Sequence, residues 1–216
     1  MTEIRLHDVE LLPERTLGTP ADDRPLRGRL TFGWDLLPAG HAGAPTGWSS
    51  YLEAAPEREF RHLLMVCSFR PETPENKGVF RHAALGVALA TPDPAHRPVA
   101  RLIDPGERTR PVPGTGTGVS FTVTTGVLDV GVERPPGATP AREEWIVRGH
   151  GASQPDPQWE FRRLKAFPLL GDHPVSALVE LVPDHPNTAH ILLSAELHNR
   201  TLRRYRAHLT PTPITL

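Results

Sequence analysis

The chain contains a single cysteine among its 216 residues. One cysteine excludes an internal disulfide and any metal cluster built from cysteine ligands. Cys67 lies in the apolar stretch 63–67, and such a setting is typical of a buried, inert thiol. We therefore expect Cys67 to belong to the core and not to act as a nucleophile.

The sequence also shows no long apolar run and no pattern of a secretory leader, and its net charge is close to zero. The first residues do not combine a basic start with an apolar segment, and no run approaches the roughly 18 apolar residues that span a bilayer. The formal net charge of −1 gives no global field toward nucleic acid or anionic lipid. We expect a soluble cytoplasmic protein, with neither a membrane nor a nucleic acid as its partner.

Proline, by contrast, is abundant, with 25 residues, and 18 glycines accompany it. Proline lacks an N–H group and blocks helix interiors, so many short strands separated by turns fit this composition better than long helices. Leu, Ile, Val and Phe make up about a quarter of the chain, which is enough to build a core. The sequence predicts an all-β fold, namely a single β-sandwich-like domain of about eight to ten strands with at most one or two short helices.

Alternation of apolar and polar residues gives the positions of the strands. It is clearest where Val119, Phe121 and Val123 share one face, and the change of parity after Gly126 predicts a β-bulge. Ser50 and Glu53 have the spacing of a capping box and predict a brief helix over 51–55. The expected strands are 4–9, 30–37, 63–69, 79–90, 97–102, 119–124, 128–132, 143–148, 159–167 and 175–182.

Two segments remain open between helix and strand. Residues 56–69 carry a helical stripe at Phe60, Leu63, Leu64 and Cys67, but they also alternate, and we favour a strand over 63–69. Residues 189–209 fit either a helix or a hairpin that turns at 198–200, and we favour the hairpin.

The domain organisation follows from the loops. Residues 1–29 are expected to form a short strand followed by an arm rich in Pro and Gly, and residues 30–216 the β-sandwich-like domain. The glycine-rich loop 114–118 precedes a strand and lacks the Lys-Ser or Lys-Thr of a phosphate loop. We therefore expect no nucleotide cofactor, and the sequence indicates no other cofactor.

No catalytic motif is evident. The weak candidates for acid–base chemistry are His150, which has glycine on both sides, and the carboxylates Glu143, Glu144 and Asp156. A metal site would need histidines that are distant in the sequence, such as His150 with His82 or His198, and we expect none. The repeated Asp-His-Pro tripeptides at 172–174 and 184–186 are interpreted as turns.

Two surfaces are candidates for binding. The first carries the aromatic residues Trp34, Trp48 and Tyr51, and the second is a C-terminal arginine strand with Arg203, Arg204 and Arg206. A further basic cluster, 162–165, would join the second surface if the two strands paired, although such charges also protect sheet edges from aggregation.

The sequence thus favours a binding or protein-interaction module without catalytic activity, whose partner is a protein or a small anionic ligand. One alternative is a small enzyme with a site assembled from loops around His150. The other is a structural subunit of a larger assembly, with homo-oligomers included. No stretch resembles a known family closely enough to transfer a function.

Overall fold

The computed structural model describes residues 4–14, 25–73, 78–112, 123–124, 127–128, 142–198, 204–208 and 213–216. Within these residues the chain is nearly all β, with fourteen strands and one short helix, α1 (Trp48–Glu53). The prediction of an all-β fold is confirmed, and the strands exceed the eight to ten expected.

The strands follow one another along the chain as follows: β1 (His7–Pro13), β2 (Leu26–Pro38), β3 (Phe60–Phe69), β4 (Val79–Ala90), β5 (Val99–Asp104), β6 (Glu107–Val112), β7 (Val123–Thr124), β8 (Val127–Leu128), β9 (Arg142–His150), β10 (Gln158–Arg162), β11 (Gly171–Glu180), β12 (Thr188–His198), β13 (Arg204–His208) and β14 (Pro213–Thr215).

The chain forms two compact units. The main unit consists of Met1–Arg108 and Trp145–Leu216, and the small unit of Thr109–Glu144. In the small unit, β7 and β8 pair antiparallel, with Thr124 opposite Val127, so the chain reverses between these residues. The predicted bulge that would continue one strand past Gly126 is therefore wrong, because a reversal also changes the parity of the residues that follow it. Gly126 itself, like the loop 114–118, lies outside the described residues.

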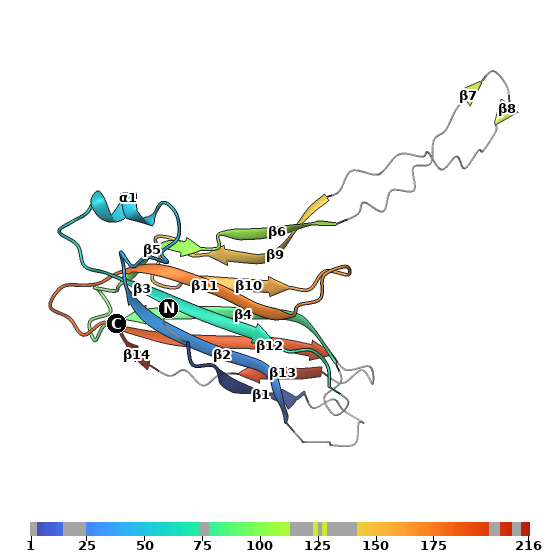
Figure 1. Cartoon of the computed structure of the whole chain (residues 1–216), viewed down its shortest axis with the longest axis horizontal. Coiled ribbons are helices and arrows are strands. Elements are labelled where there is room, and N and C mark those ends of the chain that lie inside the picture. The colour runs from blue at the N-terminus through green and yellow to red at the C-terminus, as the bar shows by residue number, and fades with distance from the viewer. Residues whose placement is uncertain are drawn as a thin grey trace. The chain divides into compact units, whose positions relative to one another are not determined.

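One large antiparallel sheet runs through the main unit, in the order β5-β11-β3-β2-β1-β13-β12-β4-β10-β9-β6, with β14 paired to β12. Strands that are distant in the sequence are neighbours here, as β1 and β13 are (Figure 1). Pro174 of β11 lies opposite Val66, whereas β5 joins β11 only from Ser176 onward. The missing N–H of this proline therefore costs no hydrogen bond on the β5 side.

The two ends of this sheet approach each other, so that it is nearly closed and barrel-like. The Ala100 N–H on β5 donates to the Gln154 carbonyl over 3.0 Å, and the Ser153 N–H donates to the Ala100 carbonyl over 2.7 Å. The Gly149 N–H donates to the Gly106 carbonyl over 2.8 Å. The loop between β9 and β10 thus satisfies backbone groups at the exposed edge of β5.

The larger of two hydrophobic clusters among the described residues lies inside this sheet. It includes Leu30 of β2, Leu85 of β4, Trp159 of β10 and Val179 of β11, none of which is exposed. A second, smaller cluster of buried residues packs Trp48 of α1 against Phe60 and Leu178. The helix therefore covers one end of β3 and β11, the region that carries His62.

Both open segments contain strands within the described residues: β3 occupies 60–69 of the first, and β12 and β13 occupy 189–198 and 204–208 of the second. Residues 199 and 200 of the predicted turn lie outside the described residues. Residues 60–69 form a strand, as their alternation predicted, and not a helix. This strand, β3, is paired with β2 and with β11, and it points Leu63, Met65 and Cys67 into the core. Over 189–209, β12 and β13 form the predicted antiparallel pair. The predicted strand over 159–167 is wrong beyond Arg162, where β10 ends.

Within the described part of the chain, no helix has the length and apolar character that a membrane crossing requires.

Candidate binding site at the basic end of the sheet

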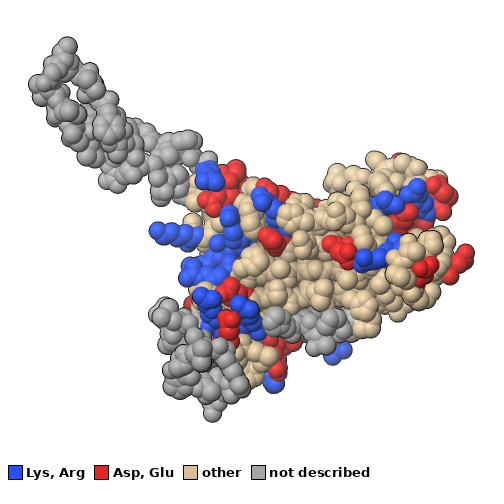
Figure 2. All heavy atoms as spheres, turned by 180° about the vertical axis from the view of Figure 1, so that it is seen from behind, with Lys and Arg blue, Asp and Glu red and all other residues tan. Residues whose placement is uncertain are grey.

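Arginine side chains gather at one end of the main sheet, which we call the basic end. It is formed by Arg81, Arg162, Arg163, Arg204 and Arg206, where β10 finishes and β13 begins. Seen from behind, Lys and Arg side chains concentrate at this end of the molecule (Figure 2). The basic end therefore joins residues from both basic clusters of the sequence.

The register of the strands fixes how these clusters are arranged. Arg206 of β13 lies opposite Glu196 of β12, which lies opposite His82 of β4, which in turn lies opposite Arg162 of β10. Residues directly opposite one another point to the same face of a sheet. The two clusters do not pair directly, because β12 and β4 separate them by roughly 14 Å, or three inter-strand spacings.

Acidic groups neutralise the β13 side of this row. Arg206 forms an ion pair with Glu14 at 3.3 Å and lies beside Glu196. The hydrogen bond from His198 lowers the pKa of the Glu196 carboxyl, burial opposes the shift, and the nearby arginines lower the pKa further. Glu196 is therefore ionised and, with Glu14, offsets positive charge on the β13 side.

On the β10 side, the indole ring of Trp145 packs against Arg162 of the basic end and against Arg148 of β9. The guanidinium carbon of Arg162 lies 4.3 Å from the ring centroid of Trp145, and that of Arg148 lies 4.9 Å from it. Arg148 also donates to Glu107 over 2.8 Å. Stacking on an aromatic face holds the guanidinium groups of Arg162 and Arg148 in place.

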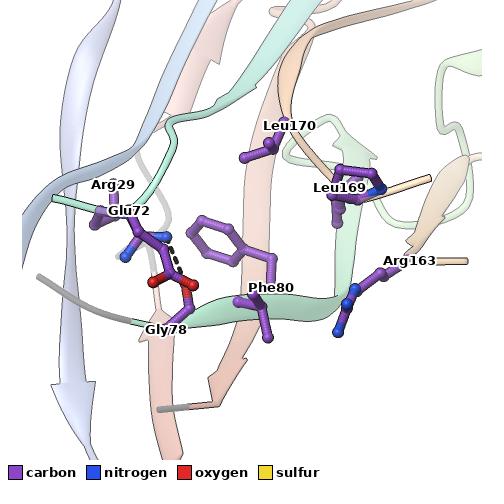
Figure 3. Close-up of a pocket in the computed structure, with 9 residues that line it drawn as sticks. Arg29, Glu72, Gly78, Phe80, Arg163, Leu169 and Leu170 are labelled. Carbon is purple, nitrogen blue, oxygen red and sulfur yellow. Dashed lines mark hydrogen bonds between the residues drawn. The ribbon is translucent and has the colours of Figure 1, made fainter. Parts of the chain in front are cut away.

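A cavity of about 100 Å³ opens at the basic end. It lies between β2, β4 and the loop that joins β10 to β11, and Figure 3 shows its lining. Phe80, Leu169 and Leu170 give it an apolar wall. Arg29 and Arg163 bring positive charge from two different elements, and Glu72 brings a negative charge. An apolar cavity of about 150 Å³ can admit benzene, so this one suits a smaller group, such as the end of an aliphatic side chain.

Arg29 forms the buried part of this site and is only 1% exposed. Its guanidinium donates to the Gly78 carbonyl over 2.8 Å and to the Arg70 carbonyl over 3.2 Å, and it lies 5.5 Å from the centroid of the Phe80 ring. Burial lowers the pKa of Arg29, and the Glu72 carboxylate partly offsets that shift. An arginine keeps its charge in such a setting, so Arg29 is a fixed cation in the cavity wall, with the Glu72 carboxylate beside it.

Arg163 supplies a free donor. Its Nε is buried, and no acceptor lies within hydrogen-bond distance of it among the residues that the structure describes. The backbone N–H of Arg163 donates to the Arg81 carbonyl over 3.1 Å, which ties the start of the β10–β11 loop to β4. A buried donor without a partner is costly, so an oxygen acceptor that reached this Nε after a shift of the Arg163 side chain would gain a hydrogen bond at little desolvation cost.

The aromatic residues predicted as a binding surface do not share one environment. Trp34 on β2 is 40% exposed, whereas Trp48 is 4% exposed and packs edge-on against His62 with ring centroids 4.8 Å apart. Tyr51 contacts Phe60, with ring centroids 5.9 Å apart. Of the three, Trp34 alone presents a broad apolar surface to solvent. Arg203 lies outside the described residues, while Arg204 and Arg206 are exposed.

The acid–base candidates lie on β9 and in the loop that follows it. His150 is exposed at the end of β9, opposite Gln158. Asp156 is ion-paired with Arg97 at 2.7 Å, and Glu144 stands six positions before His150 on β9, at the boundary of the small unit.

Two groups of functional interest were not found from the sequence. Arg29 could not be singled out, because it is one of several arginines in 24–29 and only the fold buries it. Asp93, His96 and His185 come together at the other end of the sheet, although the last is 89 positions from His96 in the sequence. The Asp-His-Pro turn at 184–186 was the one visible sign of this second group.

The comparisons with known proteins add no relationship: no family model matches the chain, and no curated protein is similar to it.

Proposed function

We propose that the protein is a binding module that takes an acidic segment of another protein at its basic end. An apolar side chain of that segment enters the cavity beside Phe80, and a neighbouring carboxylate accepts from Arg163. Further acidic residues lie against Arg81. The observation that carries this proposal is the buried, unpartnered Nε of Arg163 at the rim of an apolar cavity.

The size and charge of the site support a protein segment over a small free anion. The cavity wall is mostly apolar and its volume matches one aliphatic group, which an inorganic anion does not need. The arginines outside the cavity extend the positive surface along the ends of β4 and β10. Arginine is also enriched among the residues that contribute most to protein interfaces.

We also propose that the fold is sandwich-like, with opposite halves of the sheet enclosing the core between them. It places the protein in the cytoplasm, where the lone thiol of Cys67 would stay reduced.

Fluorescence anisotropy tests the proposal with a labelled peptide in which Asp and Leu alternate. We expect this peptide to bind, with an affinity that falls as salt is raised. A peptide with Lys in place of Asp should bind at least tenfold more weakly, because it faces like charges. A peptide with Gly in place of Leu should also lose affinity, because it leaves the cavity empty.

Two variants locate the site. Arg163→Gln should weaken binding by about tenfold, since a hydrogen bond to a charged group contributes roughly 1.5 kcal/mol or more. Arg61→Gln is the matched control, because Arg61 is a partly exposed arginine at the opposite end of the sheet, paired with Glu59 at 2.7 Å. Equal affinity of the wild type, Arg163→Gln and Arg61→Gln for the Asp-Leu peptide would contradict the proposed site. Tight binding of free phosphate or acetate would favour a small anionic ligand instead of a protein segment.

A further inference from the structure

The end of the sheet opposite the cavity brings together two turns. β4 and β12 pair along their whole length, with Ala90 opposite Thr188. The turn 91–98 that follows β4 therefore lies beside the turn 181–187 that precedes β12. The first turn carries Asp93 and His96, and the second carries His185.

Hydrogen bonds order the first turn. The Thr91 hydroxyl lies 2.7 Å from the Asp93 carbonyl oxygen and 2.6 Å from that of His96, and it donates to one of them. The Ala95 N–H donates to Oδ1 of Asp93 over 3.0 Å, which leaves the other carboxylate oxygen, Oδ2, beside Nδ1 of His96 at 2.8 Å. The imidazole and the carboxylate are thus held together before any ligand arrives.

A buried amide orders the second turn. Asn187 is 6% exposed, accepts from the Val182 N–H over 2.9 Å, and donates to the carbonyls of Val182 and His185 over 3.0 and 2.8 Å. Nδ1 of His185 lies 2.8 Å from the Pro183 carbonyl oxygen, which can only accept a hydrogen bond. The proton of neutral His185 is therefore on Nδ1, and Nε2 keeps its lone pair for a ligand.

From this convergence we propose that Asp93, His96 and His185 form a binding site for one divalent transition-metal ion, with Zn²⁺ as the natural occupant. One ligand atom from each residue lies within 4.8 Å of the others, and the two imidazole centroids are 5.8 Å apart. Bonds of about 2.0–2.1 Å in a tetrahedral site place neighbouring ligand atoms about 3.3 Å apart. Small side-chain rotations close that difference, because the side chains of His96 and Asp93 are 63% and 45% exposed.

The donor set selects the kind of metal. Two imidazoles and one carboxylate suit Zn²⁺ and its neighbours in the first transition row, whereas Mg²⁺ and Ca²⁺ require mainly oxygen ligands. The ion takes the place of the hydrogen that Nδ1 of His96 shares with Asp93. The proton of the neutral ring moves to Nε2, so the imidazole stays neutral when its Nδ1 binds the ion. Three protein ligands leave a fourth position for water.

A bound ion would link the turn after β4 to the turn before β12. The site is separate from the proposed peptide site, because Val79 at the start of β4 lies beside the cavity and Ala90 at its end lies beside the metal ligands. Twelve strand residues span roughly 36 Å at ~3.3 Å per step. Failure of either proposal therefore leaves the other standing.

The test uses the full chain, stripped of metal with EDTA and titrated with ZnCl2 alone. We expect one equivalent to bind and to raise Tm by about 5 °C at a hundredfold excess over Kd. CoCl2 should give the intense visible absorption of a four-coordinate site, and MgCl2 should change neither the spectrum nor Tm.

His96→Ala and His185→Ala identify the ligands, and His82→Ala is the matched control at the basic end of the same sheet. Each ligand variant should weaken Zn²⁺ binding at least tenfold and abolish the Co²⁺ spectrum, while the control keeps both. His96 is exposed, so its variant should fold, and circular dichroism checks this. Unchanged Zn²⁺ affinity and spectrum in both ligand variants, or equal stabilisation by MgCl2, would overturn the proposal.

Discussion

The Nδ1 atoms of His41 and His62 lie 3.3 Å apart, and the edge of the Trp48 ring packs against His62. Two Nδ1–H groups cannot face each other at this distance, so one ring must accept from the other. His62 is 2% exposed, and burial, together with the nearby His41, lowers its pKa to about 4. The pair therefore contains a neutral His62 at physiological pH.

This pair predicts a loss of stability in mild acid. The pKa of His62 rises to about 6.5 when the chain unfolds, so the unfolded state binds the proton more tightly. The contribution to stability is complete above pH 6.5 and is lost as the pH falls toward 4. Between pH 7.5 and pH 5 we expect a decrease of about 2 kcal/mol in the free energy of unfolding, measured by urea denaturation.

The variant His62→Gln isolates this contribution, because its amide does not titrate. The variant should lose about 2 kcal/mol less than the wild type over the same pH interval, whatever its absolute stability. His82→Gln, which alters a histidine at the basic end, should keep the wild-type slope. A slope in His62→Gln equal to that of the wild type would show that His62 is not the titrating group.

The approach of the two sheet ends can be tested with two glycines. A Cβ added at Gly149 would lie 2.6 Å from the Pro105 carbonyl oxygen and 3.1 Å from the Trp159 ring, whereas one added at Gly86 would lie 3.8 Å from Cβ of Leu192. Gly149→Ala should therefore lower the free energy of unfolding by about 2 to 3 kcal/mol, because the backbone at Pro105 or at residue 149 must move to make room for the added methyl group. Gly86→Ala should stay within about 0.5 kcal/mol of the wild type or be slightly stabilising. Similar effects of the two substitutions in urea denaturation would argue against the close contact at Gly149.

The thiol of Cys67 should report on opening of the core. It is fully buried on β3, and burial raises its pKa far above the usual value. The thiolate is the reactive form, so an aromatic disulfide reagent should label the native protein at least about a thousandfold more slowly than the urea-unfolded chain. Spectrophotometry of the released thiol measures both rates. Rapid labelling in the absence of denaturant would place Cys67 outside a stable core.

Local pattern was sufficient for most of the strands. Val87 and Leu89 alternate with small residues, and that period alone indicates β4 with one buried face. The end of β10 was missed because Leu164 and Phe167 continue an apolar pattern, whereas the chain there turns, with the Leu164 and Phe167 backbones hydrogen-bonded to each other. Closure of the sheet was not predictable, since the contact of Ala100 with Gln154 joins loops and edges that are far apart in sequence.

The candidate sites depended more strongly on the fold. The cluster at 162–165 was visible as charge, but nothing local shows that Arg163 would share a cavity with Arg29. The metal ligands were missed because their convergence results from the register of β4 with β12. Sequence spacing detects ligands on one strand or helix, and here two turns supply them.

A double-mutant cycle tests the proposed peptide site most directly. It combines the wild-type protein and Arg163→Gln with two peptides, the Asp-Leu peptide and its uncharged counterpart with Asn in place of Asp. We predict that Arg163→Gln weakens binding of the Asp-Leu peptide about tenfold and changes binding of the Asn peptide little. This difference corresponds to a coupling free energy of at least about 1 kcal/mol between Arg163 and the peptide carboxylates. An equal loss of affinity for both peptides would contradict a contact between Arg163 and a carboxylate.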